Sequence, residues 1–403
     1  MIDLASIAVA QRRAQSRAND LIDLAAHLSQ IPAPTGAEAQ RAIALEALLV
    51  ERGFTPARSA SNTVYVRIGD SAAPALMLAA HTDTVFPFDT DLRLTWTADR
   101  VAAPGVGDNC VGVAATVVAL EELVQDPQVP PIIAAFTVGE EGLGNLRGAR
   151  EAVDEYGPGL YGFVAVEGHN LGRVTHVGVG SVRWRITVSG PGGHSWGAFG
   201  KPSAIHALAR IVQNIAALEV PKHPRTTYNV GLITGGTSVN TIASSASAVV
   251  DMRSIDALAL RDLTERVRSL AHEQRSNEIG VEIEVLGERA AGATPQGAAL
   301  VVTACDALRA LDIDPILDAS STDANAAIGA GIPAVCIGIT RGGFGHTINE
   351  YIERAPVATG LAQLLLLARN AAPAAGDEAP QRIVKVRRDY NSWVASETME
   401  DYA

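Results

Sequence analysis

Two adjacent glutamates, Glu140 and Glu141, follow an apolar run at residues 132–138. Successive side chains of an extended chain point to opposite sides, so the two carboxylates are expected to face different targets. A carboxylate in such a place can bind a metal ion or move a proton. The solvated end of a strand would also explain this pair of glutamates. The choice between a structural and a chemical role therefore depends on which other residues lie near the pair.

A histidine and an aspartate mark the end of a second apolar run, at residues 75–80. His81 and Asp83 are two positions apart, and residues at i and i+2 of an extended chain face the same way. His81 suits a metal ion, and Asp83 suits the carboxylate that orients a ligating imidazole. Taken alone, a hydrogen-bonded His–Asp pair at a strand end explains these residues equally well.

Three further polar residues, Asp108, Glu167 and His346, follow apolar runs or lie among glycines. Asp108 belongs to residues 103–115, a glycine-rich stretch without the lysine of a P-loop or the G-x-G-x-x-G order of a dinucleotide site. It could cap the helix that follows or bind a metal. Two histidines and several carboxylates at separate strand ends together predict a two-metal site with nitrogen and oxygen ligands.

Short apolar runs alternate with helical stretches through the first part of the chain. Strands are predicted at residues 63–69, 75–80, 132–138 and 163–167, and helices at residues 36–53 and 111–125. Such alternation is typical of an α/β fold with a largely parallel sheet. We therefore expect a doubly wound, mostly parallel sheet with helices on both faces, which binds ligands at the carboxyl ends of its strands.

The pattern changes at about residue 180. Trp184, Ile186 and Val188 alternate with polar residues, as in a half-exposed strand. Strands that face water on one side suit an antiparallel sheet, so we expect an inserted α+β domain before the first pattern returns. A catalytic domain is predicted in two parts, at residues 1–178 and 294–375. The inserted lid domain is predicted at residues 179–293 and a C-terminal arm at residues 376–403.

Composition limits the classes of partner. The chain has 403 residues, a formal net charge of −12 and no Lys/Arg-rich run, which argues against nucleic acid or an anionic membrane as a partner. Residues 1–30 lack the basic start and long apolar centre of a signal peptide and predict a helix. Cys110, Cys305 and Cys336 are far apart and odd in number, which favours reduced thiols and a cytoplasmic location.

Nine short segments together resemble one family of enzymes. In chain order they are HTDTV, GVGDNCVGVA, GEEGLG, VEGHN, GPGGHSW, GGTSVNTIA, DMRS, TDANAAIGAGIPAV and GFGHTINE. This series resembles the dinuclear metallo-hydrolases that include peptidase T, carboxypeptidase G, acetylornithine deacetylase and the aminoacylases. The resemblance implies a zinc-type peptidase domain interrupted by a lid domain that also makes a homodimer. It further implies two divalent ions per subunit, with zinc as first choice and manganese or cobalt as alternatives.

Matching these segments position by position assigns the site residues that the resemblance implies. The metal ligands would be His81 and Glu167 for one ion, Glu141 and His346 for the other, and Asp108 between the two. Glu140 would be the general base, which takes a proton from the attacking water and passes it to the leaving nitrogen. Asp83 would support the imidazole of His81.

Three residues of the inserted domain would complete the site. His194 of one subunit would reach the partner's site and stabilise the oxyanion, Asn240 would help to hold the substrate, and Arg289 would bind a substrate carboxylate. Two positions depart from the usual pattern of the family. Gly139 stands where an acid is common before the glutamate pair, and Cys110 lies close to the bridging aspartate.

The other charged and imidazole side chains in these segments are expected to be structural. Arg253 is expected to pair with Asp251 or another acid of the lid rather than to contact the substrate. His169, His176 and His206 are expected at the surface or in packing.

The leading hypothesis is a two-metal hydrolase that cleaves the C–N amide bond of a small peptide or N-acyl amino acid with a free carboxylate. A second hypothesis keeps the metals but removes an amino group from a small, for example aromatic, amino acid. A third is a non-catalytic binding relative, which the presence of Glu140 and all five candidate ligands disfavours. The exact substrate stays open, because Glu167 resembles the carboxypeptidase and deacylase branches whereas residues 322–325 resemble peptidase T.

Overall fold

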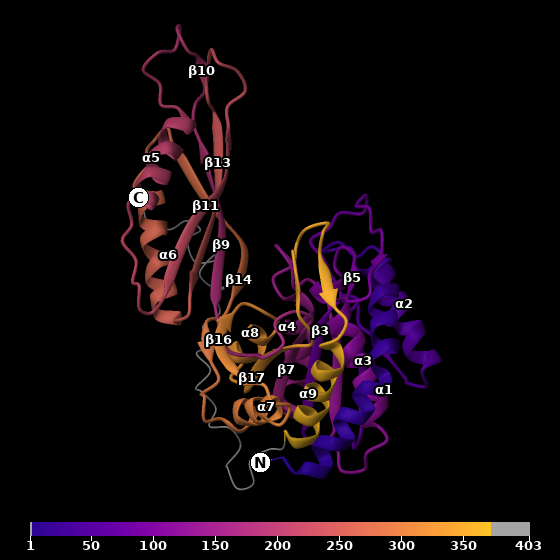
Figure 1. The fold of residues 1–403 in the computed structure, drawn as a ribbon. Helices are drawn as coiled ribbons and strands as arrows, with labels where there is room; N and C mark the ends of the chain where they lie inside the picture. Colours follow the sequence, from indigo (N-terminus) through magenta and orange to yellow (C-terminus); the bar gives the residue numbers. More distant parts are fainter. Residues whose placement is uncertain (1, 372–403) are drawn as a thin grey trace. The chain divides into compact units, whose positions relative to one another are not determined.

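Four neighbouring parallel strands form the middle of the main sheet in the computed structural model, which describes residues 2–371 (Figure 1). In order across the sheet they are β6 (Ile132–Thr137), β3 (Ala75–His81), β7 (Leu160–Glu167) and β17 (Ala334–Gly338). All three pairings between them are parallel, so their carboxyl ends reach the same edge. β6, β3 and β17 are buried along their whole length, as expected for strands covered on both faces.

Mostly antiparallel strands extend this sheet at its two edges. β2 (Val64–Ile68) pairs with β6, and β1 (Ala57–Arg58) pairs with β2. At the other edge, β8 (Arg173–Gly178) is antiparallel to β17 and β15 (Gly292–Ala293) is antiparallel to β8, whereas β16 (Ile316–Ser320) is parallel to β8. A separate small sheet consists of β18 (Gly342–Gly343), β19 (Tyr351–Glu353), β5 (Arg100–Ala102) and β4 (Thr95–Trp96).

Helices cover both faces of the central sheet, because each strand buries alternate side chains on opposite sides. In β3, Leu76, Leu78 and Ala80 belong to one core, while Met77 and Ala79 belong to the other. The helices of the first core are α1 (Leu4–Ser29), α2 (Ala39–Glu51), α3 (Val111–Leu123), α7 (Ala299–Arg309) and α9 (Val357–Asn370). Those of the second core are α4 (Arg147–Tyr156) and α8 (Ala324–Gly329).

A second, antiparallel sheet lies within residues 180–289. Its strands in order are β11 (Thr226–Gly235), β13 (Ser245–Ser254), β9 (Gly180–Ser189) and β14 (Gly280–Arg289). α5 (Ala204–Ala216) and α6 (Ala257–His272) pack on one face through a core of their own. That core contains Trp184, Ile186 and Val188, as the alternation predicted. Nearby, β10 (Gly193–His194) pairs with β12 (Thr241–Ile242).

The predicted α/β class with a largely parallel central sheet is confirmed. Both sheets belong to one compact unit, so the proposed domain boundaries near residues 178 and 293 stay a prediction. β8, β16, α4 and α8 were not predicted. Of these, β16 is largely exposed and α8 has only 6 residues, so the local patterns of these two are weak. The arm expected at 376–403 lies outside the described residues. Within residues 2–371, no helix is long and apolar enough to cross a membrane.

Candidate metal centre

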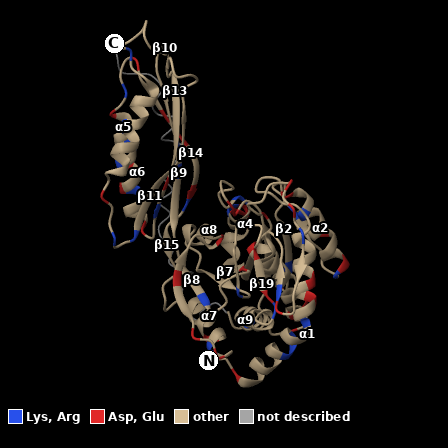
Figure 2. Ribbon diagram, turned by 45° about the horizontal axis from the view of Figure 1, so that its top comes forward, with Lys and Arg blue, Asp and Glu red and all other residues tan. Residues whose placement is uncertain are grey.

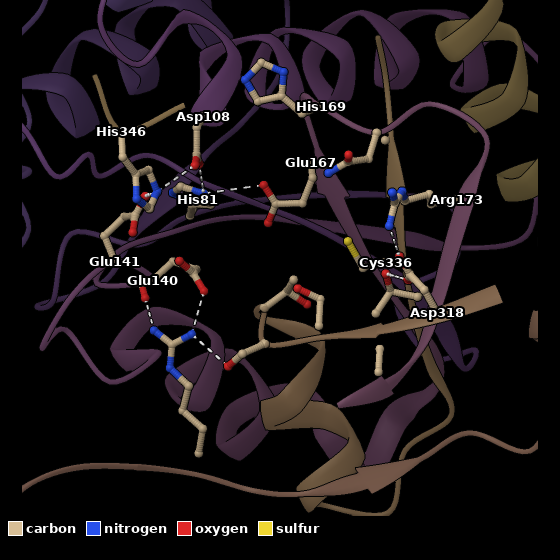
Figure 3. Close-up of a pocket in the computed structure, with 18 of the residues that line it drawn as sticks. His81, Asp108, Glu140, Glu141, Glu167, His169, Arg173, Asp318, Cys336 and His346 are labelled. Atoms are coloured by element: carbon tan, nitrogen blue, oxygen red, sulfur yellow. Dashed lines mark hydrogen bonds and ion pairs between the residues drawn. The ribbon is translucent and has the colours of Figure 1, made fainter. Parts of the chain in front are cut away.

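The carboxyl edge of the central sheet gathers the polar side chains that the strand ends predicted (Figure 3). His81 is the last residue of β3, Glu167 is the last residue of β7, and Glu140 and Glu141 follow β6. His346 lies in the loop between β18 and β19. All five line one cavity of about 540 Å³. Strand order explains this for the four residues at the ends of β3, β6 and β7, because parallel neighbours end at the same edge of a sheet.

Two sets of side-chain atoms in this cavity have the spacing of metal ligands. In the first set, His81 Nε2 lies 3.0 Å from Asp108 Oδ1 and 3.5 Å from Glu167 Oε2. In the second set, His346 Nε2 lies 3.0 Å from both Asp108 Oδ2 and Glu141 Oε1. Asp108 is common to both sets and turns one oxygen toward each. One imidazole and two carboxylates per set suit zinc and similar divalent ions, so these residues fit the implied metals.

A third set overlaps the first two. His81, Glu140 and Glu141 also lie close enough together to hold one ion. In that arrangement Glu140 would be a ligand and could not act as the base. Glu140 Oε1 accepts a hydrogen bond from Arg289 Nη1 at 2.9 Å, which leaves only Oε2 either to bind an ion or to accept a proton. One oxygen of Glu140 is therefore already paired with a cation.

Burial and crowding of like charges shift the pKa values of this cluster. Burial raises the pKa of Glu140 to about 8, and burial together with the Asp108 charge raises the pKa of Glu141 to about 7. The hydrogen bond to Asp108 is the main cause that raises the pKa of His346 to about 9. Burial also disfavours the ionised form of Asp108, but hydrogen bonds from His346 and His81 outweigh it and lower its pKa. The cluster needs protons or cations to balance its carboxylates, and divalent ions would displace those protons.

Asp83 positions the backbone of the glutamate pair. Its buried carboxylate accepts the N–H of Glu140 at 3.0 Å, the N–H of Glu141 at 2.9 Å and the hydroxyl of Thr35 at 2.8 Å. His81 Nδ1 lies 3.1 Å from the backbone oxygen of Asp83 but 3.6 Å from its carboxylate. The main chain of Asp83 therefore contacts the imidazole more closely than its side chain does, and the side chain holds Glu140 and Glu141, which the sequence did not predict.

Asp108 lies in η1 (Val106–Cys110), a short π-helical turn that Glu350 holds in place. The buried carboxylate of Glu350 accepts three backbone N–H groups, those of Gly105, Gly107 and Asp108, at 2.7, 3.0 and 2.7 Å. His169 Nε2 lies 3.1 Å from the same carboxylate, and His169 also lines the cavity. His169 was expected only at the surface or in packing, but it also contacts the carboxylate that holds the Asp108 turn. Sequence reasoning missed Glu350 because no local pattern distinguishes it from a solvated carboxylate.

The two positions that depart from the family pattern have structural explanations. Gly139 has a φ of +71°, and a Cβ there would lie 3.0 Å from the carbonyl oxygen of Gly144. A left-handed backbone favours glycine, so an acid at this position would strain the turn that carries Glu140. Cys110 is buried in the core and belongs to none of the ligand sets found in residues 2–371. Burial raises the pKa of its thiol, which disfavours the thiolate that a metal binds.

His194 of β10 and Asn240, the residue before β12, lie close to each other. The Ser195 N–H donates to the backbone oxygen of Asn240 at 2.9 Å. His194 Nδ1 accepts the N–H groups of Trp196 and Gly197 at 3.2 and 3.3 Å. Both predicted residues are exposed, and neither is among the described residues that line the cavity. Their roles toward a substrate stay predictions, because the resemblance assigns His194 to the partner's site.

Arg289 does reach the cavity, from the last position of β14, and it is buried. Its Nη1 donates to Glu140 Oε1 at 2.9 Å and to the hydroxyl of Ser321 at 3.1 Å, while Nη2 donates to the backbone oxygen of Glu140. The sequence predicted a substrate carboxylate for Arg289 but not this pairing with Glu140. The arginine therefore fixes the carboxylate predicted to be the base.

The remaining side chains that were expected to be structural have local partners or lie in solvent. Arg253 Nε donates to Asp251 Oδ2 at 2.9 Å, as expected, although Arg253 also lines the cavity. His176 is buried, with Nδ1 2.7 Å from the backbone oxygen of Thr294, and His206 is exposed. These two histidines agree with the prediction.

A mostly parallel α/β sheet that carries two imidazole–carboxylate sets at its carboxyl edge defines a class, the metal-dependent hydrolases. The sequence model of peptidase family M20/M25/M40 matches residues 77–370, and the chain belongs to this family. Its members and this chain are therefore hydrolases of the metallo-peptidase and deacylase type.

Individual relatives agree with this assignment. The succinyl-diaminopimelate desuccinylase of Cereibacter sphaeroides is 28% identical in an alignment 380 residues long, which covers 84% of this chain and 94% of that protein. The solved structure of the aminopeptidase PepT from Bacillus cereus matches with a TM-score of 0.72 at 20% identity and covers 88% of this chain and 98% of its own. The YXEP protein of Bacillus subtilis, a dinuclear metal binding peptidase of the M20 family, matches with a TM-score of 0.63 at 16% identity, with coverages of 88% and 98%. At such identities the two structures show the shared fold alone.

Proposed function

We propose that this chain hydrolyses the C–N amide bond of a small peptide or N-acyl amino acid, with two divalent ions and with Glu140 as general base. The observation that carries the proposal is the pair of ligand sets that share Asp108 and open into the same cavity as Glu140. Paired cations beside a carboxylate suit the hydrolysis of unreactive acyl bonds. The name of one similar protein, a desuccinylase, supports the same kind of reaction.

The metal ligands we propose are those of the two sets that share Asp108. They are His81, Asp108 and Glu167 for one ion, and Asp108, Glu141 and His346 for the other. Mixed nitrogen and oxygen donors favour zinc, our first choice, with manganese or cobalt as alternatives. When bound, the ions would polarise the scissile carbonyl and lower the pKa of the attacking water.

We assign the proton transfer to Glu140 Oε2. Oε1 is paired with Arg289 Nη1, which fixes the carboxylate, whereas Oε2 has no hydrogen-bond partner within residues 2–371. Oε2 would accept a proton from the attacking water and return it to the leaving nitrogen. Arg289 would bind a substrate carboxylate, Asn240 would help to hold the substrate, and the partner subunit's His194 would stabilise the oxyanion.

A substrate panel tests this proposal. The full chain, loaded with zinc, manganese or cobalt, is incubated with dipeptides, N-acyl amino acids and aminobenzoates, and the products are followed by mass spectrometry and an ammonia assay. We expect cleavage of at least one peptide or N-acyl amide, loss of this activity after chelation, and recovery when the ion is returned. Ammonia release without peptide or acyl cleavage would instead establish the aminohydrolase. No turnover together with less than one bound ion per chain would establish the binding relative.

We further propose a homodimer formed through the inserted region. β11 is an edge strand of the second sheet, and Leu232 and Ile233 on it are 66% and 60% exposed. An uncovered apolar edge strand pairs readily with a second copy about a two-fold axis. Sedimentation equilibrium should give the mass of two chains, and Leu232→Lys should shift it toward one chain. Leu258→Lys is the control, because Leu258 is 65% exposed on α6, and an equal shift in this variant would contradict an interface at β11.

A cytoplasmic location stays a prediction. Cys110, Cys305 and Cys336 are free and buried, which supports a reducing compartment. The expectation that neither nucleic acid nor a membrane surface is a partner rests on the acidic charge balance.

A further inference from the structure

The carboxylate of Glu350 joins three backbone N–H groups of the Asp108 turn to one imidazole. Glu350 is fully buried and directly precedes β19. Its Oε2 accepts the N–H of Gly105, and its Oε1 accepts those of Gly107 and Asp108. His169 Nε2 lies 3.1 Å from the same Oε1. Because a carboxylate can only accept, Nε2 carries the proton and donates the fourth hydrogen bond.

The imidazole of His169 has no second polar contact. Nδ1 is buried and has no hydrogen-bond partner within residues 2–371, and Nε2 is bonded to Glu350. His169 lines the cavity on the side of Asp108 and Glu167 (Figure 3), but it belongs to none of the ligand sets found in the described residues. Neither ring nitrogen is therefore free to bind an ion or a substrate. The hydrogen bond to Glu350 is the polar contact that the ring makes.

Glycines make room for this ring on two sides. A Cβ on Gly107 would lie 2.2 Å from His169 Nε2, and a Cβ on Gly342 would lie 2.5 Å from His169 Cε1. Gly107 does not have a positive φ, so the close approach of the ring, and not the backbone conformation, explains glycine there. The ring thus packs between the Asp108 turn, which contains Gly107, and the segment that leads from Gly342 to His346.

The contact between His169 and Glu350 ties together three segments that carry proposed metal ligands. His169 is two residues after Glu167, Glu350 is four residues after His346, and Asp108 donates its own N–H to Glu350. η1 lies against both β7, which ends at Glu167, and β19, which follows Glu350; Figure 2 labels the two strands. A shift of any one of these segments would therefore strain its contact with the other two.

Asp83 plays a comparable part in the other half of the centre. Its carboxylate accepts the N–H groups of Glu140 and Glu141, and its main chain contacts His81. Neither Asp83 nor Glu350 belongs to a ligand set within the described residues. Each half of the centre thus has one buried carboxylate that accepts backbone N–H groups of ligand-bearing segments. In the half that contains Asp108, that carboxylate has an imidazole partner of its own.

We propose that His169 and Glu350 are positioning residues that fix Asp108 between the two metal ions. The inference rests on the proposed ligand sets, in which Asp108 serves both ions. Because Oδ1 and Oδ2 of Asp108 must address different ions, a small rotation of the turn weakens both contacts at once. Glu350 opposes this rotation through the N–H of Asp108 itself, at 2.7 Å, and His169 fixes the carboxylate of Glu350. Loss of the His169 donor should therefore lower the affinity for both ions.

A matched pair of substitutions at His169 tests this role. Gln places an N–H donor close to the position of Nε2, whereas Met has nearly the same length and no donor. His169→Met should weaken the binding of both ions roughly tenfold or more, the usual effect of losing an outer partner of a metal centre. His169→Gln should stay close to the wild type. Competition with a chromophoric chelator measures both dissociation constants in the full chain.

The absorption spectrum of the chain at saturating Co²⁺ is a second readout, which a loss of stability alone would not change. The d–d bands of Co²⁺ follow the number and geometry of its ligands. His169→Met should therefore alter these bands, and His169→Gln should restore them. Glu350→Gln should alter them more, because its amide would turn an N–H toward a backbone N–H group. If Glu350→Gln does not fold, as circular dichroism would show, the two His169 variants decide the proposal.

His176→Met is the matched control outside the centre. His176 is also buried, its Nδ1 lies 2.7 Å from the backbone oxygen of Thr294, and it is not among the described residues that line the cavity. The substitution removes a buried polar contact in the same way, so the unfolding midpoint should fall. Both dissociation constants should nevertheless keep their wild-type values. An equal loss of metal affinity in this control would assign the effect to general instability and overturn the proposal.

Three further results would overturn it. Unchanged metal affinity in His169→Met would show that the hydrogen bond does not position Asp108. An equal loss in His169→Met and His169→Gln would assign the effect to the packing of the ring. A raised KM with unchanged metal affinity would make His169 a substrate contact. Each of these results leaves the proposed function standing when the wild-type chain binds two ions, whereas a wild-type chain with less than one ion would overturn both proposals.

Discussion

Glu140→Gln is expected to lower kcat by roughly 10³-fold, while the metal content stays at the wild-type level. Gln has the shape of Glu and still offers Oε1 to Arg289, but it cannot accept and return a proton at Oε2. Proton transfer by a positioned side chain contributes about 10²–10⁴-fold, so the loss should fall in this range. Steady-state kinetics on a substrate found in the panel measure kcat, and inductively coupled plasma mass spectrometry measures the bound ions.

Glu141→Gln is the matched control, since it makes the same chemical change one residue away. Glu141 Oε1 lies 3.0 Å from His346 Nε2 and belongs to the second ligand set. This variant should therefore lose metal, toward one ion per chain, and lose activity with it. Equal metal loss in the two variants would show that Glu140 is a ligand, together with His81 and Glu141, and not the base.

The buried pair of Glu140 and Arg289 requires a second control. Removing one charge of a buried ion pair costs about 3–5 kcal/mol when the other charge is left uncompensated. The unfolding midpoint of Glu140→Gln should therefore fall, and kinetics must be measured well below it. Arg289→Gln breaks the same pair from the other side and should mainly raise KM. A comparable loss of kcat in this variant would assign the effect to the pair rather than to the proton.

The part of the site that could be predicted from the sequence is the part fixed by strand ends. Short apolar runs identified β3, β6 and β7 without any knowledge of packing. Once those strands are parallel neighbours, the residues that follow them must meet at one edge of the sheet. This reasoning needs only periodicity and residue type, and it brought His81 and Glu167 to one cavity.

The rest of the site depends on contacts between residues far apart in the chain. Glu140 and Arg289 are 149 positions apart, and Glu350 is 245 positions from Gly105, whose N–H it accepts. Such pairs change neither the hydrophobic periodicity nor the local composition of either segment. Gly139 looked like a lost acid for a different, local reason, because residue type alone does not reveal the positive φ of the turn that it forms with Gly144.

Asp108→Ala is expected to remove both metal ions and, with them, all measurable turnover. Asp108 is the one side chain that the two proposed ligand sets share, with Oδ1 3.0 Å from His81 Nε2 and Oδ2 3.0 Å from His346 Nε2. Alanine keeps the backbone N–H that Glu350 accepts, so the turn should hold its shape. Metal content should fall from two ions per chain to less than one. A saturating ion, which stabilises a protein by about 4 kcal/mol at 1,000 times its Kd, should no longer raise the unfolding temperature.

His81→Ala and His346→Ala separate a shared ligand from a site that simply collapses. Each histidine belongs to only one of the two proposed sets that share Asp108, so each variant should lose one ion and keep the other. Asp108→Ala would then lose as many ions as the two histidine variants lose together. This is the result expected of a carboxylate that both ions share. Loss of both ions in all three variants would indicate that the ions bind cooperatively through the whole cluster. Retention of one ion in Asp108→Ala, with unchanged affinity, would show that Asp108 serves a single ion and that the two sets are independent.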